Sequence, residues 1–253
     1  MESFVSLNAS EPVACNSAVS TASIWQDVLA QAVTGEVMAA MNYRALSTIC
    51  DAPEEVAEAL EHAQGEQGHA AAFIAEGQKI GVDVPSNINA RYWKRIREAF
   101  MLSIADSDFI ACLIVQEVML ESFAVASYTR VGKSAPGSLG KTFAAIAAEE
   151  EEHIDHALDI LRSERAKDSR RFDDKVYRLH LEVMTTLTEM VAKECSQGQC
   201  ELCHGTCVKP SLSDVGLTTA DLRGASLQRY LKTLDMLGLP GEVTLQWITQ
   251  LPA

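Results

Sequence analysis

Positive charge is scarce in this sequence, in which 21 lysines and arginines stand against 35 aspartates and glutamates. The formal net charge of −14 argues against a general affinity for nucleic acid or for anionic membranes, because both attract basic proteins. We therefore expect no nucleic-acid partner. Carboxylates that bind cations would account for part of the negative excess.

The sequence also lacks a long apolar run and a secretory leader. Its most apolar stretch, residues 109–120, is too short to span a bilayer and contains Gln116 and Glu117. We assign this stretch to a protein core and expect no membrane span. The start of the chain has no cationic segment, which predicts a flexible tail over residues 1–22. An odd count of seven cysteines, without a leader, favours a reducing cytoplasm.

The alternating pattern of a strand and the glycine-rich loop of a phosphate site are missing too. Apolar residues instead recur at helical spacing, and glycines and prolines interrupt them. The expected helices cover residues 24–50, 54–80, 90–105, 109–128, 138–162, 171–194 and 217–237, with a loop at 131–137 and a short helix at the end. Thr218 or Thr219 is expected to cap the helix at 217–237. The predicted fold is all-α, with four long helices as a bundle and shorter ones around it.

Two Glu-x-x-His motifs stand on separate long helices, Glu66 with His69 and Glu150 with His153. A helix projects residues i and i+3 from one face, so each motif sets a carboxylate beside an imidazole. Four-helix bundles use such pairs to hold a two-metal centre, together with one carboxylate from each of two other helices. Each motif alone also fits a pair on a solvated helix surface.

The other two long helices each offer a carboxylate in an apolar setting. Glu36 is the one acid in the middle of the first helix, and Glu117 and Glu121 share a face of the fourth. A charged carboxylate in a core is costly unless it is paired or bound to a cation. The order Glu, Glu-x-x-His, Glu, Glu-x-x-His along the chain indicates two metal ions. Carboxylate and imidazole donors suit iron or manganese.

Two residues are candidates for roles beside the metal ligands. Glu117 fits either an additional ligand or a proton carrier, because it lies one turn before Glu121. His156 lies one turn beyond His153 and is either an outer residue of the site or a surface residue.

These residues resemble those of the cyanobacterial aldehyde-deformylating oxygenases, a family within the ferritin-like di-iron superfamily. The resemblance is clear over residues 25–165 and fainter beyond. The matching segments are Gly35-Glu36 with Asn42-Tyr43, Glu66-Gln67-Gly68-His69 with Phe73-Ile74-Ala75, Cys112-Leu113-Ile114-Val115-Gln116, Glu121-Ser122-Phe123-Ala124 with Tyr128, and Glu150 with His153. The resemblance implies a single ferritin-like domain over residues 23–253, a four-helix bundle with additional shorter helices.

The same resemblance implies a di-iron oxygenase. The residues that it assigns to two irons are Glu36, Glu66, His69, Glu121, Glu150 and His153. Members of the family use O2 and external electrons to convert a long-chain aldehyde to an alkane or alkene plus formate. The implied partners are a small substrate with an apolar tail, O2 and a ferredoxin-type electron donor.

Three residues depart from the family pattern. Glu117 replaces a small neutral residue, His156 an aromatic one and Glu76 a cysteine. Such changes near the metal would alter proton delivery, metal choice or substrate polarity. We expect catalytic roles for Glu117, Tyr128 and His156.

Four cysteines gather near the C-terminus in a predicted loop at residues 195–210: Cys195, Cys200, Cys203 and Cys207. Four thiolates within so short a segment are able to close around one Zn²⁺, which predicts a zinc site that braces the loop. The first three have a plant-ferredoxin-like spacing, but the fourth follows too closely for that pattern. A redox or cluster role and unligated thiols stay open as alternatives.

Two other classes of function stay open beside the oxygenase. One is a ferroxidase or peroxide-detoxifying protein of the ferritin and rubrerythrin kind, although the long C-terminal region makes a storage shell awkward. The other is a catalytically silent helical module, which is least expected because core carboxylates without metal are costly. Two basic stretches, at residues 91–97 and 162–171, fit solvated helix faces or a docking surface for an acidic ferredoxin.

Overall fold

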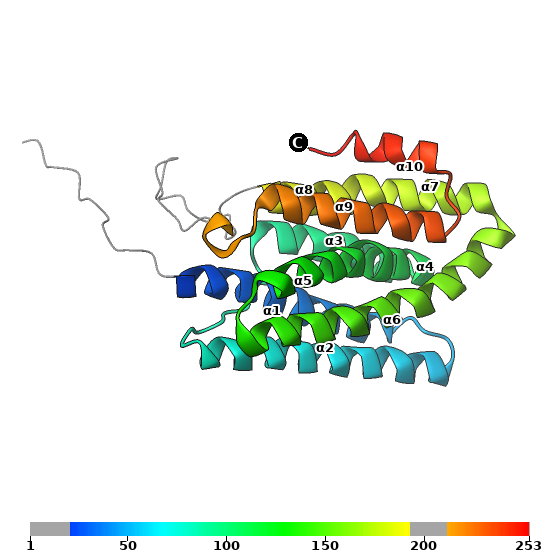
Figure 1. Cartoon of the computed structure of the whole chain (residues 1–253). Helices are drawn as coiled ribbons and strands as arrows, with labels where there is room; N and C mark the ends of the chain where they lie inside the picture. The colour runs from blue at the N-terminus through cyan, green and yellow to red at the C-terminus, as the bar shows by residue number, and fades with distance from the viewer. Residues whose placement is uncertain (1–20, 193–211, 253) are drawn as a thin grey trace, which may run out of the picture.

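The structure is a computed structural model and describes residues 21–192 and 212–252 (Figure 1). Helices and short turns make up this part of the chain, which contains no strand. The bundle helices are α1 (Thr21–Leu46), α2 (Pro53–Lys79), the continuous run of α4 (Phe109–Leu113), η1 (Ile114–Glu121) and α5 (Ser122–Ser134), and α6 (Gly137–Lys167). The outer ones are α3 (Arg91–Ala105), α7 (Ser169–Leu179), η2 (His180–Met184), α8 (Thr185–Ala192), η3 (Leu212–Val215), α9 (Thr219–Met236) and α10 (Gly241–Ile248). The predicted all-α bundle is confirmed.

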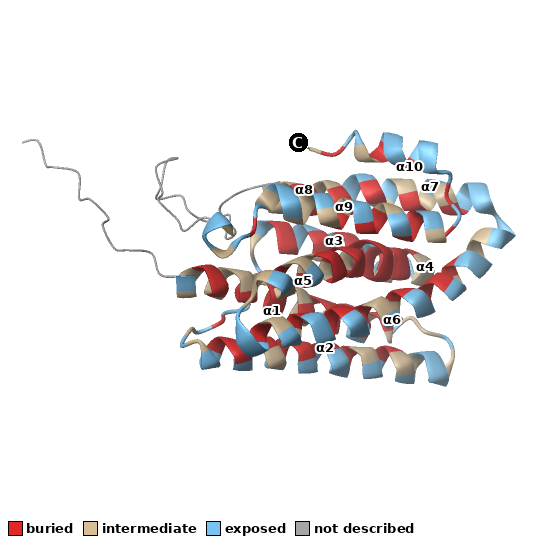
Figure 2. Ribbon diagram, viewed as in Figure 1, coloured by how far each residue is buried: buried red, intermediate tan, exposed pale blue. Residues whose placement is uncertain are grey.

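The four long helical runs pack in neighbouring pairs. α1 lies along α2 and α5 along α6, while α2 and α6 also contact each other. α9 covers α5, and α3 contacts α1 and α4 (Figure 1). Buried residues face the interior of the bundle on all four runs (Figure 2).

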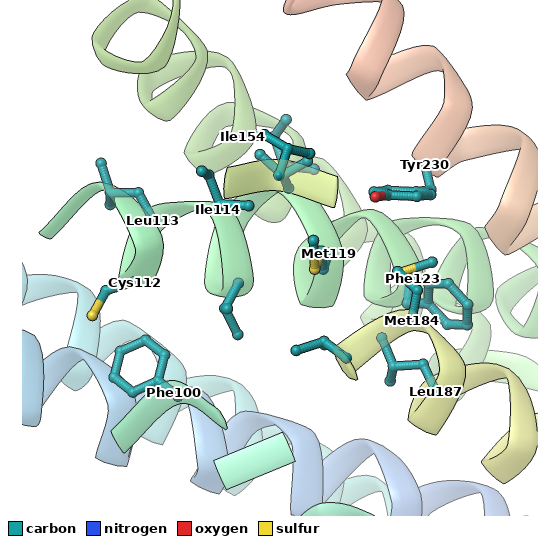
Figure 3. Close-up of a cluster of buried hydrophobic side chains, with 14 of the residues drawn as sticks. Phe100, Cys112, Leu113, Ile114, Met119, Phe123, Ile154, Met184, Leu187 and Tyr230 are labelled. Atoms are coloured by element: carbon teal, nitrogen blue, oxygen red, sulfur yellow. The ribbon is translucent and has the colours of Figure 1, made fainter. Parts of the chain in front are cut away.

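A polar layer divides the hydrophobic core along the bundle. One hydrophobic cluster includes Ile154 of α6 and joins η1 to α9 (Figure 3), and the other includes Ala147 of α6. The acids that lie between the two clusters in sequence are Glu36 on α1, Glu66 on α2 and Glu150 on α6. The bundle therefore sets three carboxylates at one level, with apolar residues on either side.

The run formed by α4, η1 and α5 changes its helical pitch within the core. η1 is π-helical, and it carries both Glu117 and Glu121. π-helical segments inside α-helices often accompany functional sites, because the wider turn re-aims side chains. Sequence analysis did not predict this segment, since the run is buried nearly all round and shows no clear periodicity.

Part of the loop predicted at residues 131–137 is wrong, because α5 continues to Ser134. Val131 is buried, and Gly132 lies so near α6 that a Cβ there would be 3.1 Å from the Gly140 carbonyl oxygen. These contacts keep the helix intact until Ala135, which is extended because Pro136 follows.

The run formed by α4, η1 and α5 also proves longer than expected. From Phe109 to Ser134 it meets the length and composition of a membrane span, yet 78% of its most apolar window is buried inside the protein. A core helix of a globular bundle has this property. The predicted tail at residues 1–22 ends two residues too late, because Thr21 and Ala22 already belong to α1. Its remaining residues, 1–20, and the four clustered cysteines lie outside the described residues.

Candidate metal centre

Four side chains from three helices converge in the polar layer. The His69 Nδ1 atom lies 2.8 Å from Glu150 Oε1, 3.3 Å from Glu36 Oε2 and 3.4 Å from Glu66 Oε2. One donor atom from each of the four residues lies within 4.8 Å of the others, and all four residues are buried. α1 supplies Glu36, α2 supplies Glu66 and His69, and α6 supplies Glu150.

His153 approaches the same carboxylates from the other side. Its Nδ1 atom lies 2.9 Å from Glu150 Oε2 and 3.8 Å from Glu66 Oε1. Glu66 and Glu150 therefore each direct one oxygen towards His69 and the second oxygen towards His153. Two carboxylates shared between two imidazoles form the arrangement expected for two adjacent cations.

The converging atoms are close, but they do not satisfy one another. Both carboxylate oxygens of Glu66 and of Glu150, and the Nδ1 atoms of His69 and His153, are buried without a hydrogen-bond partner among the described residues. Unpartnered buried polar atoms cost free energy, and buried carboxylates cost most. A bound cation would remove this cost, because these oxygen and nitrogen atoms could coordinate it together. The residues present therefore fit a metal centre.

Burial and mutual charge shift the protonation of the ion-free cluster. Burial and then the nearby Glu150 raise the pKa of Glu66 well above its ordinary value. Burial would also raise the pKa of Glu150, but the adjacent His153 and His69 lower it overall. Burial would lower the pKa of His69, but the carboxylates of Glu150, Glu36 and Glu66 raise it overall. The site therefore has an excess of negative charge, which attracts cations.

Glu121 lies outside the group of four and is held by a chain of polar side chains. Its Oε1 accepts a hydrogen bond of 2.5 Å from Gln116 Nε2, and Gln116 Oε1 accepts one of 2.7 Å from Asn42 Nδ2. Arg97 of α3 donates to Asn42 Oδ1. Burial, followed by the charges of Glu150 and Glu66, raises the pKa of Glu121.

Two outer residues fix the orientation of cluster members. Tyr128 donates its hydroxyl proton to Glu36 Oε1. Glu149 Oε2 lies 2.9 Å from His69 Nε2, which leaves the Nδ1 atom of that ring to face the carboxylates. A carboxylate on the outer nitrogen is a common companion of a metal-binding histidine. Sequence analysis assigned no role to Glu149, although it directly precedes Glu150.

The remaining sequence-predicted residues differ in their position. Glu117 is buried and accepts a hydrogen bond from the Tyr43 hydroxyl. The side chain of His156 is 57% exposed, and its Nε2 atom lies 3.0 Å from Glu58 Oε1. The structure thus places His156 at the surface, and its catalytic role stays a prediction. The proposed zinc ligands Cys195, Cys200, Cys203 and Cys207 fall outside the described residues.

Comparison with known proteins supports this geometry. A family model described as long-chain fatty aldehyde decarbonylase matches residues 22–227. A solved structure titled protein 19 with aldehyde deformylating oxidase activity, from Synechococcus, is similar in fold, with a TM-score of 0.74. Its sequence is 19% identical, and the match covers 91% of this chain and 98% of that one. The likeness confirms the ferritin-like bundle.

Proposed function

Because the chain belongs to the long-chain fatty aldehyde decarbonylase family, we propose that it is a di-iron, O2-dependent enzyme acting on an aldehyde with an apolar tail. The expected products are formate and a hydrocarbon one carbon shorter. The observation that carries the proposal is the position of Glu66 and Glu150 between two imidazoles, with all four oxygens free of hydrogen bonds. The family does not favour the ferritin-like or rubrerythrin-like alternative.

We propose that the six residues Glu36, Glu66, His69, Glu121, Glu150 and His153 hold two irons. Manganese is the second choice of metal, because it accepts the same donors. When bound and reduced, iron supplies the capacity to react with O2, which amino-acid side chains lack. The side chains of the protein would bind, orient and shield the reacting groups.

Three hydrogen bonds prepare the site for this task. Tyr128 holds Glu36, Glu149 holds the His69 ring, and Gln116 holds Glu121. Each partner restricts the rotation of a proposed ligand, so that the ligands keep their positions while substrate binds. Tyr128 also keeps a hydroxyl proton at Glu36, close to where the conversion consumes protons. The hydrophobic clusters on both sides of the polar layer exclude water and suit an apolar substrate tail.

A turnover assay tests the proposal. Protein loaded anaerobically with Fe(II) would receive O2, a reductant and a panel of aldehydes, acids and amines, and mass spectrometry would identify the products. We expect hydrocarbon from long-chain aldehydes alone, and none from a matched Glu150→Ala protein. Iron oxidation and O2 consumption without conversion of any compound of the panel would instead indicate a ferroxidase.

The conversion also needs an external electron source, for which we propose a ferredoxin-type donor in the cytoplasm. Arg170 and Arg171 support this idea, because both are exposed at the start of α7 and neither forms an ion pair with a described residue. We further propose a single domain over residues 23–253, with zinc bound at the cysteines of 195–207. Metal analysis of a variant with serines at these cysteines tests the zinc separately from iron.

A further inference from the structure

Glu117 is an acid that the proposed ligand set leaves unused. It lies on η1, one turn before Glu121, and is 3% exposed. The resemblance implies a small neutral residue at this position, so the carboxylate would be an addition in this chain. A buried acid needs a partner for each oxygen.

Only one of the two Glu117 oxygens has such a partner. Oε1 accepts a hydrogen bond from the Tyr43 hydroxyl, whereas Oε2 is buried without any hydrogen bond. A neutral carboxyl group would need an acceptor for its proton, and an ionised one would need a donor or a cation. Within the described part of the chain, neither a donor nor an acceptor reaches Oε2. Glu66 and Glu150 show the same unpartnered oxygens.

A row of rings connects Glu117 to the His153 end of the cluster. The Tyr43 ring stacks on His62, with centroids 5.0 Å apart and an interplanar angle of 18°. His62 in turn meets the His153 ring edge-on, with centroids 4.5 Å apart. The hydrogen bond from Tyr43 thus holds Glu117 on the η1 side of these rings. The charges of Glu117 and His153 also act on each other, each favouring the ionised form of the other.

We propose that Glu117 Oε2 is a seventh protein ligand of the metal centre, bound to the ion at the His153 end. The proposal rests on the two-metal site described above. Tyr43 would orient this ligand in the way that Gln116 orients Glu121. An added carboxylate increases the negative charge around one ion, which strengthens its binding and distinguishes it from the ion at His69.

Metal titration of variants tests the proposal without any turnover. The protein would be titrated anaerobically with Fe(II), and Mössbauer spectra would be recorded on the ⁵⁷Fe-loaded protein. Glu117→Gln retains the shape of the side chain and an acceptor for Tyr43. We expect this variant to bind one of the two irons with an affinity at least about tenfold lower than the parent. One of the two iron signals should change, and the other should not. Glu117→Ser, with the small residue of the resembling family, should give the same result if Glu117→Gln folds poorly.

Tyr43→Phe is the matched control, because it removes the hydrogen bond and leaves the carboxylate. Because the carboxylate itself stays, we expect Tyr43→Phe to lower the affinity for the same iron by less than Glu117→Gln does, and to leave the other iron unchanged. Unchanged affinity and spectra in Glu117→Gln would overturn the proposal. A larger loss in Tyr43→Phe than in Glu117→Gln would also overturn it, since the Tyr43 hydroxyl rather than the Glu117 carboxylate would then be what the iron needs. A parent protein that binds fewer than two irons would overturn the two-metal site itself, which is a separate and recognisable outcome.

Discussion

Glu150 and Glu66 differ from the other acids of the site in the number of imidazoles that they approach. Each directs one oxygen to His69 and one to His153, whereas Glu36 approaches His69 alone. At the scale of single residues, the two proposed irons therefore depend unequally on their ligands. Loss of a shared carboxylate affects both ions, and loss of an end ligand affects one.

Iron content should follow this distinction. Glu150→Ala is expected to bind almost no iron, because it removes a donor from each ion and leaves Glu66 as the single shared carboxylate. His153→Ala is expected to retain about one iron per chain. Elemental analysis after anaerobic Fe(II) loading and desalting measures both. Two irons retained by Glu150→Ala would contradict the shared role of this residue.

His180 lies far along the chain from the metal motifs and is fully buried. Its Nδ1 atom lies 3.2 Å from the Tyr230 hydroxyl and its Nε2 atom 3.2 Å from the Trp247 carbonyl oxygen. Burial lowers the pKa of His180 to about 4, although the Trp247 carbonyl partly opposes the shift. The folded protein therefore keeps this ring neutral at a pH where the unfolded chain protonates it.

Acid should destabilise the protein partly through His180. Above pH 6.5 the ring is neutral in both states, so it contributes no pH dependence there. Between about pH 6.5 and 4 the unfolded state alone binds the proton, so the free energy of unfolding falls with pH by up to about 3 kcal/mol. In His180→Phe the free energy of unfolding should fall less steeply between pH 6.5 and 4, as measured by urea denaturation of metal-free protein. Parallel curves for the parent and variant would show that His180 does not contribute.

At the scale of elements, α5 and α6 approach each other closely near Gly132 and Gly140. A Cβ on Gly140 would lie 2.7 Å from the Gly132 carbonyl oxygen and 2.9 Å from that of Ala135. Both atoms belong to the backbone, so neither can rotate away. This contact sets the spacing of the helices that carry Glu121 and Glu150.

Gly140→Ala should lower the free energy of unfolding by about 1–3 kcal/mol, because the helices must separate to admit the methyl group. Gly224→Ala is the matched control, since no atom lies within 4 Å of a Cβ at this exposed position in α9. The control should be stabilised by roughly 0.5–1 kcal/mol through helix propensity. Chemical denaturation measures both variants. Equal stabilisation of the two would mean that α5 and α6 are less tightly packed than the structure indicates.

The elements were predictable from sequence where local chemistry decides them. Pro53 begins α2, one residue before the predicted start at residue 54. Thr218 caps α9 through its hydrogen bond from the Asp221 amide, as expected. The end of α5 was not predictable, because tertiary contact with α6 extends the helix through Gly132. The π-helical pitch of η1 also has no local signal, since a helix buried on all sides shows no polar face.

The same division applies to the site. The Glu-x-x-His spacing places Glu66 and His69 on one helix face, so sequence alone suggested them. The hydrogen bond between Tyr43 and Glu117 joins residues 74 positions apart, and the one between His69 and Glu149 joins residues 80 positions apart. Periodicity within a helix carries no information on which residues of two helices meet. Such contacts depend on how the helices pack.

At the scale of the whole molecule, metal binding should be linked to folding. The formal charge of −14 includes buried carboxylates that repel one another in the ion-free protein. An ion bound only to the folded state adds about 3 kcal/mol of stability when its concentration is a hundred times its Kd. Thermal unfolding should therefore shift upwards with Fe(II) or Mn(II) and return after chelation. The Glu150→Ala protein should show little shift, and an equal shift would indicate that the ions bind elsewhere.

The central claim is that the metal centre cleaves the carbonyl carbon from an aldehyde. The most direct test is a reaction of Fe(II)-loaded protein with a long-chain aldehyde carrying ¹³C at its carbonyl, in the presence of O2 and a reductant. The account predicts that all of the label appears in formate, with an unlabelled hydrocarbon one carbon shorter, and that Glu150→Ala forms neither. Recovery of intact labelled aldehyde, while iron is oxidised and O2 is consumed, would contradict it.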